Sequence, residues 1–376
     1  MTLNHISSKR VLIRFDFNVP MYEGKIINDF RIKQSLATIQ LLLNNKNKLI
    51  IMSHLGRPNE GEYDKNNSLE PIAKYLSELL SKDIKFISTL DEQVSFDNNE
   101  ICFLENVRFN IGEKSCDESL SQRYASLADI FIFDAFGVAH RKESSTFGVS
   151  EYLETYPGLN IKHEISTINK LIKENSRPMT IIISGAKVST KLIVIKKLLS
   201  RCDHMILGGG ILNTFLKAKG YEIGLSLYEA NLVNEAKNIL NSELASKIVF
   251  PSDLLCESFS QTKNKDVINI IKDDCIYDIG ENSLQEIKKL INKSSSIFWN
   301  GPLGYVEKKP FDYATKELAK TIAKHNCFSI VGGGDTLPII ENLNLQNDYS
   351  CLSTGGGSLL TYLEDESLPI LDKLNL

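Results

Sequence analysis

The chain has 376 residues, of which 42% are hydrophobic and 24% charged, and its formal net charge is −4 at pH 7. This length predicts two domains, because a single hydrophobic core rarely serves so many residues, and the composition is that of a globular protein. The acidic balance gives no general attraction to nucleic acid or to an anionic membrane, and no apolar run approaches the roughly 18 residues that span a bilayer.

The sequence carries no pattern for export or for structural metal. Its first residues, MTLNHISSKRVLIRF, contain no cationic segment followed by an apolar one, so we expect no secretory signal. The seven cysteines are scattered from Cys102 to Cys351 without a C-x-x-C pair. That spacing argues against a disulfide framework or a zinc site and fits a reducing compartment, so we expect a cytoplasmic location.

In the first half, short β-branched apolar runs alternate with longer segments of helical periodicity, a pattern typical of βαβ units and a parallel sheet. The predicted strands are Val11–Phe15, Leu49–Met52, Ile101–Leu104 and Ile130–Phe133. One helical stripe consists of Ile32, Leu36, Ile39 and Leu43. A second consists of Ile72, Leu76 and Leu79, with Ser68 expected as N-cap and Pro71 in the first turn.

The second half repeats this alternation after a connecting segment. The segment from Thr155 to Pro178 begins with Pro-Gly and finishes with Arg-Pro, which predicts a helix between two domains. The following predicted strands are Thr180–Ile183, His204–Leu207, Lys247–Phe250, Ile297–Trp299, Phe328–Val331 and Ser350–Leu352. We therefore predict an α/β protein with two doubly wound, Rossmann-like parallel-sheet domains joined by a helix, with a cleft between the domains.

Ligands of open parallel sheets bind beyond the carboxyl ends of the strands, so the residues that follow each strand are informative. In the first half, four strand ends deliver arginine, histidine or small polar side chains to one rim: Asp16, Asn18, His54, Arg57, Arg108, His140 and Arg141, with Arg31 just before the first helix. Each residue alone fits a surface ion pair or a structural histidine, but together they favour a site for a small, multiply charged acid.

The arginines are also unevenly distributed. Seven of the nine lie between Arg10 and Arg141. Arginine is suited to forked binding of carboxylate and phosphate, so the distribution fits an anion site in the first half. Chance together with surface salt bridges fits the same count, and the count does not decide between them.

In the second half, glycine-rich loops and lysines follow the strands. These loops are SGAKVSTK with Lys187 and Lys191, GGGI, NGPLG, GGGDT and STGGG. Glycine lets the backbone approach a phosphate and point N–H groups at it, so this half is predicted to bind a nucleotide. There is no G-x-x-x-x-G-K-[ST] loop, which excludes the P-loop kinases, and no G-x-G-x-x-G follows the first strand of either half, which disfavours a dehydrogenase.

Asp335 has two interpretations, and both are compatible with the sequence. It could contact Mg²⁺, which typically takes one or two carboxylates together with substrate phosphates. It could also, with Thr336, cap the helix LPIIENL. An arginine-lined anion site and a glycine-lined nucleotide site together predict phosphoryl transfer. This reaction needs mainly positioning and charge neutralisation, and no general base when the acceptor is a carboxylate.

These motifs, in this order, resemble the phosphoglycerate kinase family over essentially the whole chain: RFDFNVP, SHLGRP, LENVRF, DAFGVAHR, GAKVSTK, WNGPLG, GGGDT and STGGG. The resemblance implies reversible, Mg²⁺-dependent phosphoryl transfer between ATP and the carboxylate of 3-phosphoglycerate, giving ADP and 1,3-bisphosphoglycerate, in glycolysis and gluconeogenesis. It also implies a monomer whose two domains close like a hinge.

The resemblance further implies a division of the chain. Residues 1–158 would form the domain that binds 3-phosphoglycerate, 159–178 the connecting helix, and 179–363 the nucleotide domain. The tail, residues 364–376, would pack back on the first domain.

Carried over motif by motif, the resemblance assigns the substrate side to Asp16, Phe17, Asn18, Arg31, His54, Leu55, Gly56, Arg57, Arg108, His140 and Arg141. It assigns the nucleotide side to Gly185, Lys187, Lys191, Gly209, Glu307, Gly333, Gly334, Asp335 and Thr336. Asp335 would hold Mg²⁺ and Glu307 would meet the ribose hydroxyls. Arg31, Lys187 and Gly356 are assigned to the transfer step, where backbone N–H groups of Gly355 to Gly357 would complete the transition-state pocket.

The sequence departs from the family pattern near the nucleotide side. Ser184 replaces a glycine before AKVS, Thr190 stands where Asp is frequent, Glu281 stands where Pro is common, and Ser358-Leu359 replaces a small pair. None of these changes removes a residue assigned to transfer, so we expect activity. The alternative is a catalytically idle relative that binds its ligands as a regulator or scaffold, which loss of Lys187 or Arg31 would favour.

Overall fold

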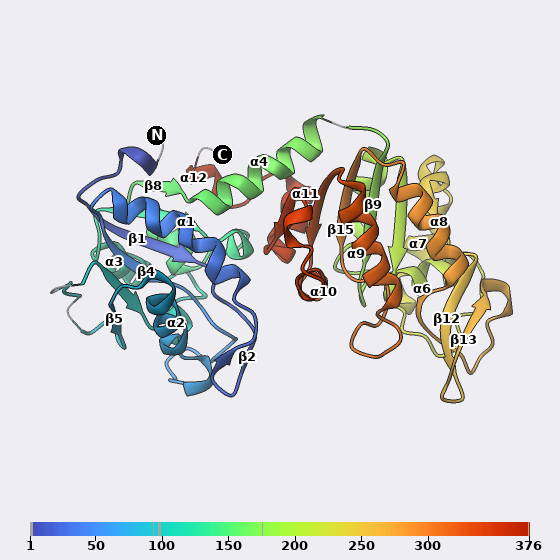
Figure 1. The fold of residues 1–376 in the computed structure, drawn as a ribbon, viewed down its shortest axis with the longest axis horizontal. Helices are drawn as coiled ribbons and strands as arrows, with labels where there is room; N and C mark the ends of the chain where they lie inside the picture. The colour runs from blue at the N-terminus through green and yellow to red at the C-terminus, as the bar shows by residue number, and fades with distance from the viewer. Residues whose placement is uncertain (1–2, 93, 97–98, 175, 375) are drawn as a thin grey trace. The chain divides into compact units, whose positions relative to one another are not determined.

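The computed structural model describes residues 3–92, 94–96, 99–174, 176–374 and 376. The chain forms two compact units, which can be followed by colour in Figure 1. Unit 1 comprises Met1–Ser166 together with Asp365–Leu376, and unit 2 comprises Thr167–Glu364. Within the described ranges, no helix combines the length and the apolar character that a membrane span requires.

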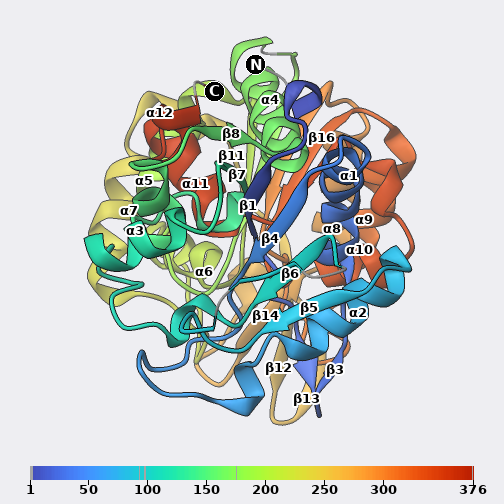
Figure 2. The ribbon, with the colours of Figure 1, turned by 90° about the vertical axis from the view of Figure 1, so that its left-hand side faces the viewer.

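Unit 1 is built on a six-stranded parallel sheet in the order β5-β6-β4-β1-β7-β8, part of which faces the viewer in Figure 2. Its strands are β1 (Arg10–Phe15), β4 (Lys48–Met52), β5 (Ile84–Ile87), β6 (Ile101–Leu104), β7 (Ile130–Asp134) and β8 (Thr155–Pro157). A short antiparallel ribbon consists of β2 (Met21–Tyr22) and β3 (Lys25–Ile26). The central strands are buried on both faces, which explains their continuous apolar sequences.

Helices α1 (Phe30–Asn44) and α2 (Glu70–Leu80) share one hydrophobic core with the sheet. Their apolar stripes face that core, as the sequence predicts. The expected N-cap of α2 is wrong by one residue, because Leu69 occupies the cap position. The Ser68 hydroxyl nevertheless accepts the Glu70 N–H at 3.2 Å and donates to the carboxylate of Glu105 at 2.6 Å. The remaining helices of unit 1 are α3 (Glu118–Ala125) and α12 (Leu371–Leu374).

Unit 2 contains a second six-stranded parallel sheet, in the order β11-β10-β9-β15-β16-β17. Its strands are β9 (Met179–Ser184), β10 (His204–Gly208), β11 (Ile248–Val249), β15 (Ser296–Asn300), β16 (Phe328–Gly332) and β17 (Cys351–Ser353). The helices are α5 (Leu192–Arg201), α6 (Gly209–Ala218), α7 (Val233–Leu240), α8 (Glu281–Ile291), α9 (Tyr313–His325), α10 (Leu337–Asn342) and α11 (Gly356–Asp365). The predicted α/β architecture with two parallel sheets is confirmed.

A three-stranded antiparallel sheet extends unit 2 and was not predicted. It consists of β12 (Asp253–Ser258), β13 (Gln261–Asp266) and β14 (Cys275–Ile279), in the order β13-β12-β14. The two-residue turn between β12 and β13 is Phe259-Ser260, and both residues have positive φ values, of 48° and 60°. Such turns usually carry Asn-Gly or Asp-Gly, so this hairpin lacks its common sequence signal.

The segment between the two sheets forms α4 (Leu159–Glu174), and Ser176, Arg177 and Pro178, which the expected helix of residues 159–178 included, lie outside it. At its start, the carboxylate of Asp134 accepts the Ile161 N–H at 2.9 Å and the hydroxyl of Thr38 at 2.7 Å. The last residues of the chain return to unit 1, where Lys373 pairs with Glu151 at 2.9 Å.

Candidate active site

The carboxyl ends of the parallel strands in unit 1 meet at one edge of the sheet, with a topological switch point between β1 and β7. The chain runs from β1 to β4 on one side, builds that half of the sheet, and then returns to place β7 on the other side of β1. Such switch points are where open α/β sheets bind ligands. Residues directly after β1, β4 and β6, and in the segment that follows β7, form the polar cluster of this edge.

Asp16, at the end of β1, is buried and receives the guanidinium of Arg31 at 2.6 Å. The Nδ1 atom of His54 lies 3.8 Å from its other oxygen. Burial opposes ionisation of Asp16, but the positive charge of Arg31, with a smaller contribution from Arg14, lowers the pKa of this carboxyl. Burial, together with the charges of Arg14 and other arginines, lowers the pKa of His54 well below its usual value, so this imidazole is neutral at pH 7.

Asn18, Gly56 and Arg108 join the ends of three strands. The side-chain oxygen of Asn18 accepts the Gly56 N–H at 2.9 Å, and the Gly56 carbonyl accepts a hydrogen bond from the Arg108 guanidinium. Arg108 is only 4% exposed. An arginine buried at a sheet edge with a glycine backbone beside it is a suitable anchor for a carboxylate or phosphate.

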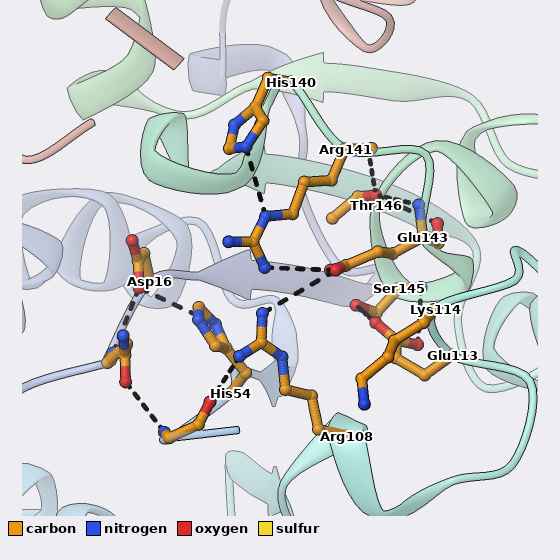
Figure 3. Close-up of polar contacts among 12 residues, drawn as sticks. Asp16, His54, Arg108, Glu113, Lys114, His140, Arg141, Glu143, Ser145 and Thr146 are labelled. Carbon is orange, nitrogen blue, oxygen red and sulfur yellow. Dashed lines mark hydrogen bonds and ion pairs between the residues drawn. The ribbon is translucent and has the colours of Figure 1, made fainter. Parts of the chain in front are cut away.

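Arg108 and Arg141 converge on one carboxylate, that of Glu143, as Figure 3 shows. The Glu143 Oε1 atom lies 3.3 Å from Arg141 Nη1 and 3.8 Å from Arg108 Nη2. His140 Nε2 lies 3.4 Å from Arg141 Nε. Burial and the charge of Arg141 lower the pKa of His140. The two histidines of the cluster are therefore polar neutral groups, and its positive charge comes from arginine.

A buried polar group behind this edge was missed by sequence reasoning. Arg14 in β1 is completely buried and donates to Ser145 Oγ at 3.0 Å, and Ser145 in turn hydrogen-bonds the carboxylate of Glu113. Burial raises the pKa of Glu113 to about 7. The sequence did contain a signal for this group, because Arg14 lies within the apolar run VLIRF. An arginine in a buried strand almost always has buried polar partners.

The remaining assigned residues of unit 1 are placed differently. The ring of Phe17 is fully buried and stacks between Phe15 and Phe103, with ring centroids 5.3 and 6.0 Å away. Leu55 belongs to the same hydrophobic core. The side chains of Phe17 and Leu55 therefore support the loop rather than face a ligand. Arg57 is exposed to solvent.

In unit 2 the switch point lies between β9 and β15, where the order of strands along the chain reverses. Lys191 occupies this position. Its ammonium donates to the Ser184 carbonyl at the end of β9 at 2.5 Å and to the Asn300 side-chain oxygen at the end of β15 at 2.6 Å. Burial lowers the pKa of Lys191 to about 8, and the charge of Asp335 partly opposes this shift. Asn300 belongs to the WNGPLG motif but was missed as a functional residue.

Glycines from neighbouring strand ends converge around this lysine. A Cβ on Gly185 would lie 3.3 Å from Lys191 Nζ, and one on Gly209 would lie 2.9 Å from the Gly185 carbonyl oxygen. Gly301 has φ +96°, and a Cβ there would lie 2.2 Å from the Ser184 oxygen. On the other side, a Cβ on Gly333 would lie 3.2 Å from the Gly301 nitrogen. The backbones at these positions thus approach one another more closely than residues with a side chain would allow.

Two buried polar atoms beside these glycines have no hydrogen-bond partner among the described residues: Asn300 Nδ2 and Thr336 Oγ1. Thr336 occupies the N-cap position of α10, as one interpretation of this motif expects, but its side chain makes no capping hydrogen bond. Unpaired buried donors are costly and rare in proteins. These two atoms therefore indicate a place for a hydrogen-bonding ligand such as a phosphate.

The other assigned residues of unit 2 are exposed: Lys187, Glu307, Gly334 and Asp335. The Lys187 carbonyl accepts the Thr190 hydroxyl at 3.0 Å, which fixes the loop that carries the lysine. Gly356 begins α11, and a Cβ on it would lie 4.0 Å from the Gly333 Cα. The described residues contain no group of three or more His, Cys, Asp or Glu that could hold a metal ion by itself. The single carboxylate of Asp335 fits Mg²⁺ only if phosphate oxygens supply the other ligands.

Comparisons with known proteins agree with this arrangement. The family model described as phosphoglycerate kinase matches residues 2–366. The chain is 44% identical over 371 residues to a phosphoglycerate kinase of Legionella pneumophila (strain Lens), covering 97% of this chain and 94% of the relative. It is 43% identical over 376 residues to that of Francisella tularensis subsp. holarctica (strain FTNF002-00 / FTA), covering 98% and 96%.

Solved structures show the same relationship. The phosphoglycerate kinase from Coxiella burnetii superposes with a TM-score of 0.85 at 39% identity, covering 98% of this chain and 96% of that chain. The enzyme from Pyrococcus horikoshii OT3 superposes with a TM-score of 0.86 at 28% identity, with the same coverage. The chain therefore belongs to the phosphoglycerate kinase family, whose members are phosphotransferases of glycolysis.

Proposed function

We propose that this chain divides the family's reaction between its two sheet edges. Unit 1 holds 3-phosphoglycerate or 1,3-bisphosphoglycerate, and unit 2 holds ATP or ADP with Mg²⁺. The phosphoryl group passes reversibly between the nucleotide and the carboxylate of 3-phosphoglycerate. The observation that carries the proposal is the clustering of arginines at the strand ends of unit 1, which suits a ligand with a carboxylate and a phosphate.

The charges of unit 1 support this assignment. Four arginines face three carboxylates: Arg14, Arg31, Arg108 and Arg141 against Asp16, Glu113 and Glu143. Glu105 lies directly after β6 at the same edge, so the arginines outnumber the carboxylates once the exposed Arg57 is counted. An anion would complete the hydrogen bonds of these guanidinium groups and neutralise the excess.

In unit 2, Lys191 and the unpaired atoms of Asn300 and Thr336 are proposed to hold nucleotide phosphates, together with the glycine backbones around them. Asp335 would hold Mg²⁺, which when bound shields the charge of the phosphates. Glu307 would meet the ribose hydroxyls. With a pKa of about 8, Lys191 stays largely protonated at neutral pH. An anion bound beside it would offset part of the free-energy cost of burying its charge.

For the transfer step, Arg31 and Lys187 are proposed to neutralise the phosphoryl group as it moves, and the Gly356 backbone N–H to bind one of its oxygens. The attacking carboxylate is already ionised, so no residue has to remove a proton. This agrees with neutral His54 and His140, which can donate or accept hydrogen bonds without changing the charge of the site. We also expect a monomer in the cytoplasm, which sedimentation and cell fractionation would test.

Calorimetric titration of two variants tests the division between the units. Arg57→Ala is expected to weaken 3-phosphoglycerate binding and to leave Mg·ATP binding unchanged, because this arginine is a static anchor on unit 1. Lys191→Met is expected to weaken Mg·ATP binding and to leave 3-phosphoglycerate binding unchanged. If Arg57→Ala bound 3-phosphoglycerate normally, Arg57 would have to be removed from the site. If either variant lost both ligands equally, the assignment of one ligand to each unit would fail.

A further inference from the structure

Glu143 is an acidic residue in the middle of a site that must attract anions. It is 6% exposed and lies just before a short helical turn, Ser144–Gly148, where its own N–H donates to the Thr146 hydroxyl at 3.1 Å. Its Oε1 atom serves both Arg141, at 3.3 Å, and Arg108, at 3.8 Å (Figure 3). The carboxylate therefore occupies the two guanidinium groups that we assign to the substrate.

This arrangement is incompletely hydrogen-bonded. Glu143 Oε2 and Arg108 Nε are both buried and have no partner among the described residues. Burial lowers the pKa of Arg108, and Glu143 is the largest charge that opposes this shift. An ion pair formed for structure alone would be expected to satisfy its buried atoms. Unpaired atoms on both partners indicate that Arg108 has further hydrogen bonds to make with another anion.

We infer that Glu143 is an internal competitor that sets the affinity of this site, because its carboxylate holds Arg108 and Arg141 until a ligand anion replaces it. The inference rests on the proposed function, which assigns the two arginines to 3-phosphoglycerate. The ligand class is a phosphomonoester that carries a second anionic group. Glu143 is a positioning and affinity-setting residue and takes no part in the transfer itself.

The competition lowers the affinity of every anion that binds these arginines by a similar factor. An ion with one charged group, such as sulfate, therefore binds only weakly. A ligand with a second anionic group, anchored elsewhere at the edge, remains above it. Removing the negative charge of Glu143 should therefore strengthen binding of sulfate and of 3-phosphoglycerate alike, and should not affect the nucleotide.

The opposite result follows if Glu143 only keeps the arginines in place. Its removal would then leave the buried guanidinium of Arg108 and the partly exposed one of Arg141 disordered or repelling each other, and anion binding would weaken. The two roles thus predict opposite signs. Glu143→Gln keeps the shape and removes the charge, Glu143→Ala provides a second neutral variant, and Glu143→Asp keeps the charge. Glu78→Gln, on the exposed face of α2, removes one negative charge elsewhere in unit 1 as a control.

The test is calorimetric titration of the full chain with 3-phosphoglycerate, sulfate and Mg·ATP, for each variant whose thermal unfolding shows that it is folded. We expect Glu143→Gln to bind 3-phosphoglycerate and sulfate about three- to tenfold more tightly, as for the loss of one competing charge at a partly screened site. Glu143→Ala should change both affinities in the same direction. Mg·ATP binding should stay the same, and Glu143→Asp and Glu78→Gln should resemble the unmodified protein.

In kinetics, the gain should appear as a lower KM for 3-phosphoglycerate without a higher kcat, because the carboxylate acts on the ground-state complex. Unchanged or weaker sulfate binding in both neutral variants would overturn the inference. An unmodified chain that binds sulfate but not 3-phosphoglycerate would instead contradict the proposed function, and the effect of Glu143 on sulfate would still be measured. The two failures are therefore distinguishable.

Discussion

At the scale of single residues, two departures from the family pattern are accommodated by packing. The hydroxyl of Ser184 donates to the Pro302 carbonyl and so ties the end of β9 to the loop after β15. Leu359 is completely buried in α11, and a Cβ on Gly332 would lie 2.5 Å from its Cδ2 atom. The larger side chain fills the space that the glycine leaves open. Neither change displaces Lys191 from its position.

The other two departures are also explained locally. The Thr190 hydroxyl donates to the Lys187 carbonyl within the same turn. Glu281 lies in the first turn of α8, where a negative charge interacts favourably with the helix dipole, and its carboxylate accepts the Gln285 amide at 2.9 Å. The Thr190 contact should therefore hold the loop that carries Lys187 in place, and Glu281 should stabilise the start of α8.

Lys187→Ala should lower kcat by about 100-fold or more, because a charge that acts mainly in the transition state is worth a factor of this order. The side chain is exposed, so its truncation should not affect folding. Steady-state kinetics with both substrates would measure the effect. Lys196→Ala, which removes an exposed lysine of α5 paired with Glu235, is the matched control. A Lys187→Ala enzyme with normal kcat and only a raised KM would show that the role is misassigned.

A second residue-scale prediction concerns the contact between Gly332 and Leu359. Gly332→Ala should destabilise unit 2, because the added methyl would overlap the Leu359 side chain. Leu359→Ala alone should cost about 2–5 kcal/mol through the cavity that it creates. In the double variant the two losses should be less than additive, since each change relieves the other. Denaturant unfolding measures the coupling, and strictly additive losses would rule out this packing explanation.

At the scale of elements, every predicted strand corresponds to a strand of the two parallel sheets, whereas β5, β8, the ribbon of β2 and β3, and the antiparallel sheet were not predicted. Strands such as β4 and β6 are nearly continuous apolar runs, because helices cover both faces of a parallel sheet. The edge strand β5 is only partly buried, and β13, with the sequence QTKNKD, is almost entirely exposed. Neither shows the periodicity on which sequence interpretation depends. For the same reason Lys247–Phe250 was predicted too long, since β11 contains only Ile248 and Val249.

The contact between β14 and α9 contains a buried acid that makes stability depend on pH. Asp278 is 2% exposed and accepts the backbone N–H groups of Ile279 at 2.8 Å and of Ala314 at 3.1 Å. Burial raises its pKa from 3.8 to about 7. Because the folded pKa is the higher one, the unfolded chain binds fewer protons between these values, and the contribution of Asp278 to the stability of the fold is lost as the pH rises from about 4 to about 7.

Asp278→Asn should therefore flatten the pH dependence of stability. Between pH 4 and pH 7, the variant should lose up to about 4 kcal/mol less of its free energy of unfolding than the unmodified protein, a value that follows from the size of the pKa shift. Asn has one side-chain oxygen and leaves one backbone N–H without a partner, so the variant is expected to be less stable at acid pH. The test is therefore the slope of stability against pH and not the stability at any one pH. Thermal unfolding from pH 4 to 8 measures it. The exposed Asp266→Asn is the control, and an unchanged slope in Asp278→Asn would contradict the ionisation of Asp278 as the cause.

At the scale of the whole molecule, two sheets with similar topology present different chemistry at their switch points. Arginines cluster in unit 1, and a lysine lies among glycines in unit 2. The residues after each strand were predictable because parallel strands deliver them to one edge. Arg14, Glu113, Glu143 and Asn300 were not predicted, because their roles depend on burial and on partners far apart in sequence. Which atoms were left unpaired could be seen only in three dimensions.

The most direct test of the account is ADP formation by the purified chain with Mg·ATP, with and without 3-phosphoglycerate, in a coupled assay that removes 1,3-bisphosphoglycerate. We predict ADP formation that requires 3-phosphoglycerate and that falls about 100-fold or more in Lys187→Ala. No turnover with both ligands still binding would contradict the account and support a catalytically idle relative. Turnover independent of 3-phosphoglycerate would contradict the assignment of unit 1.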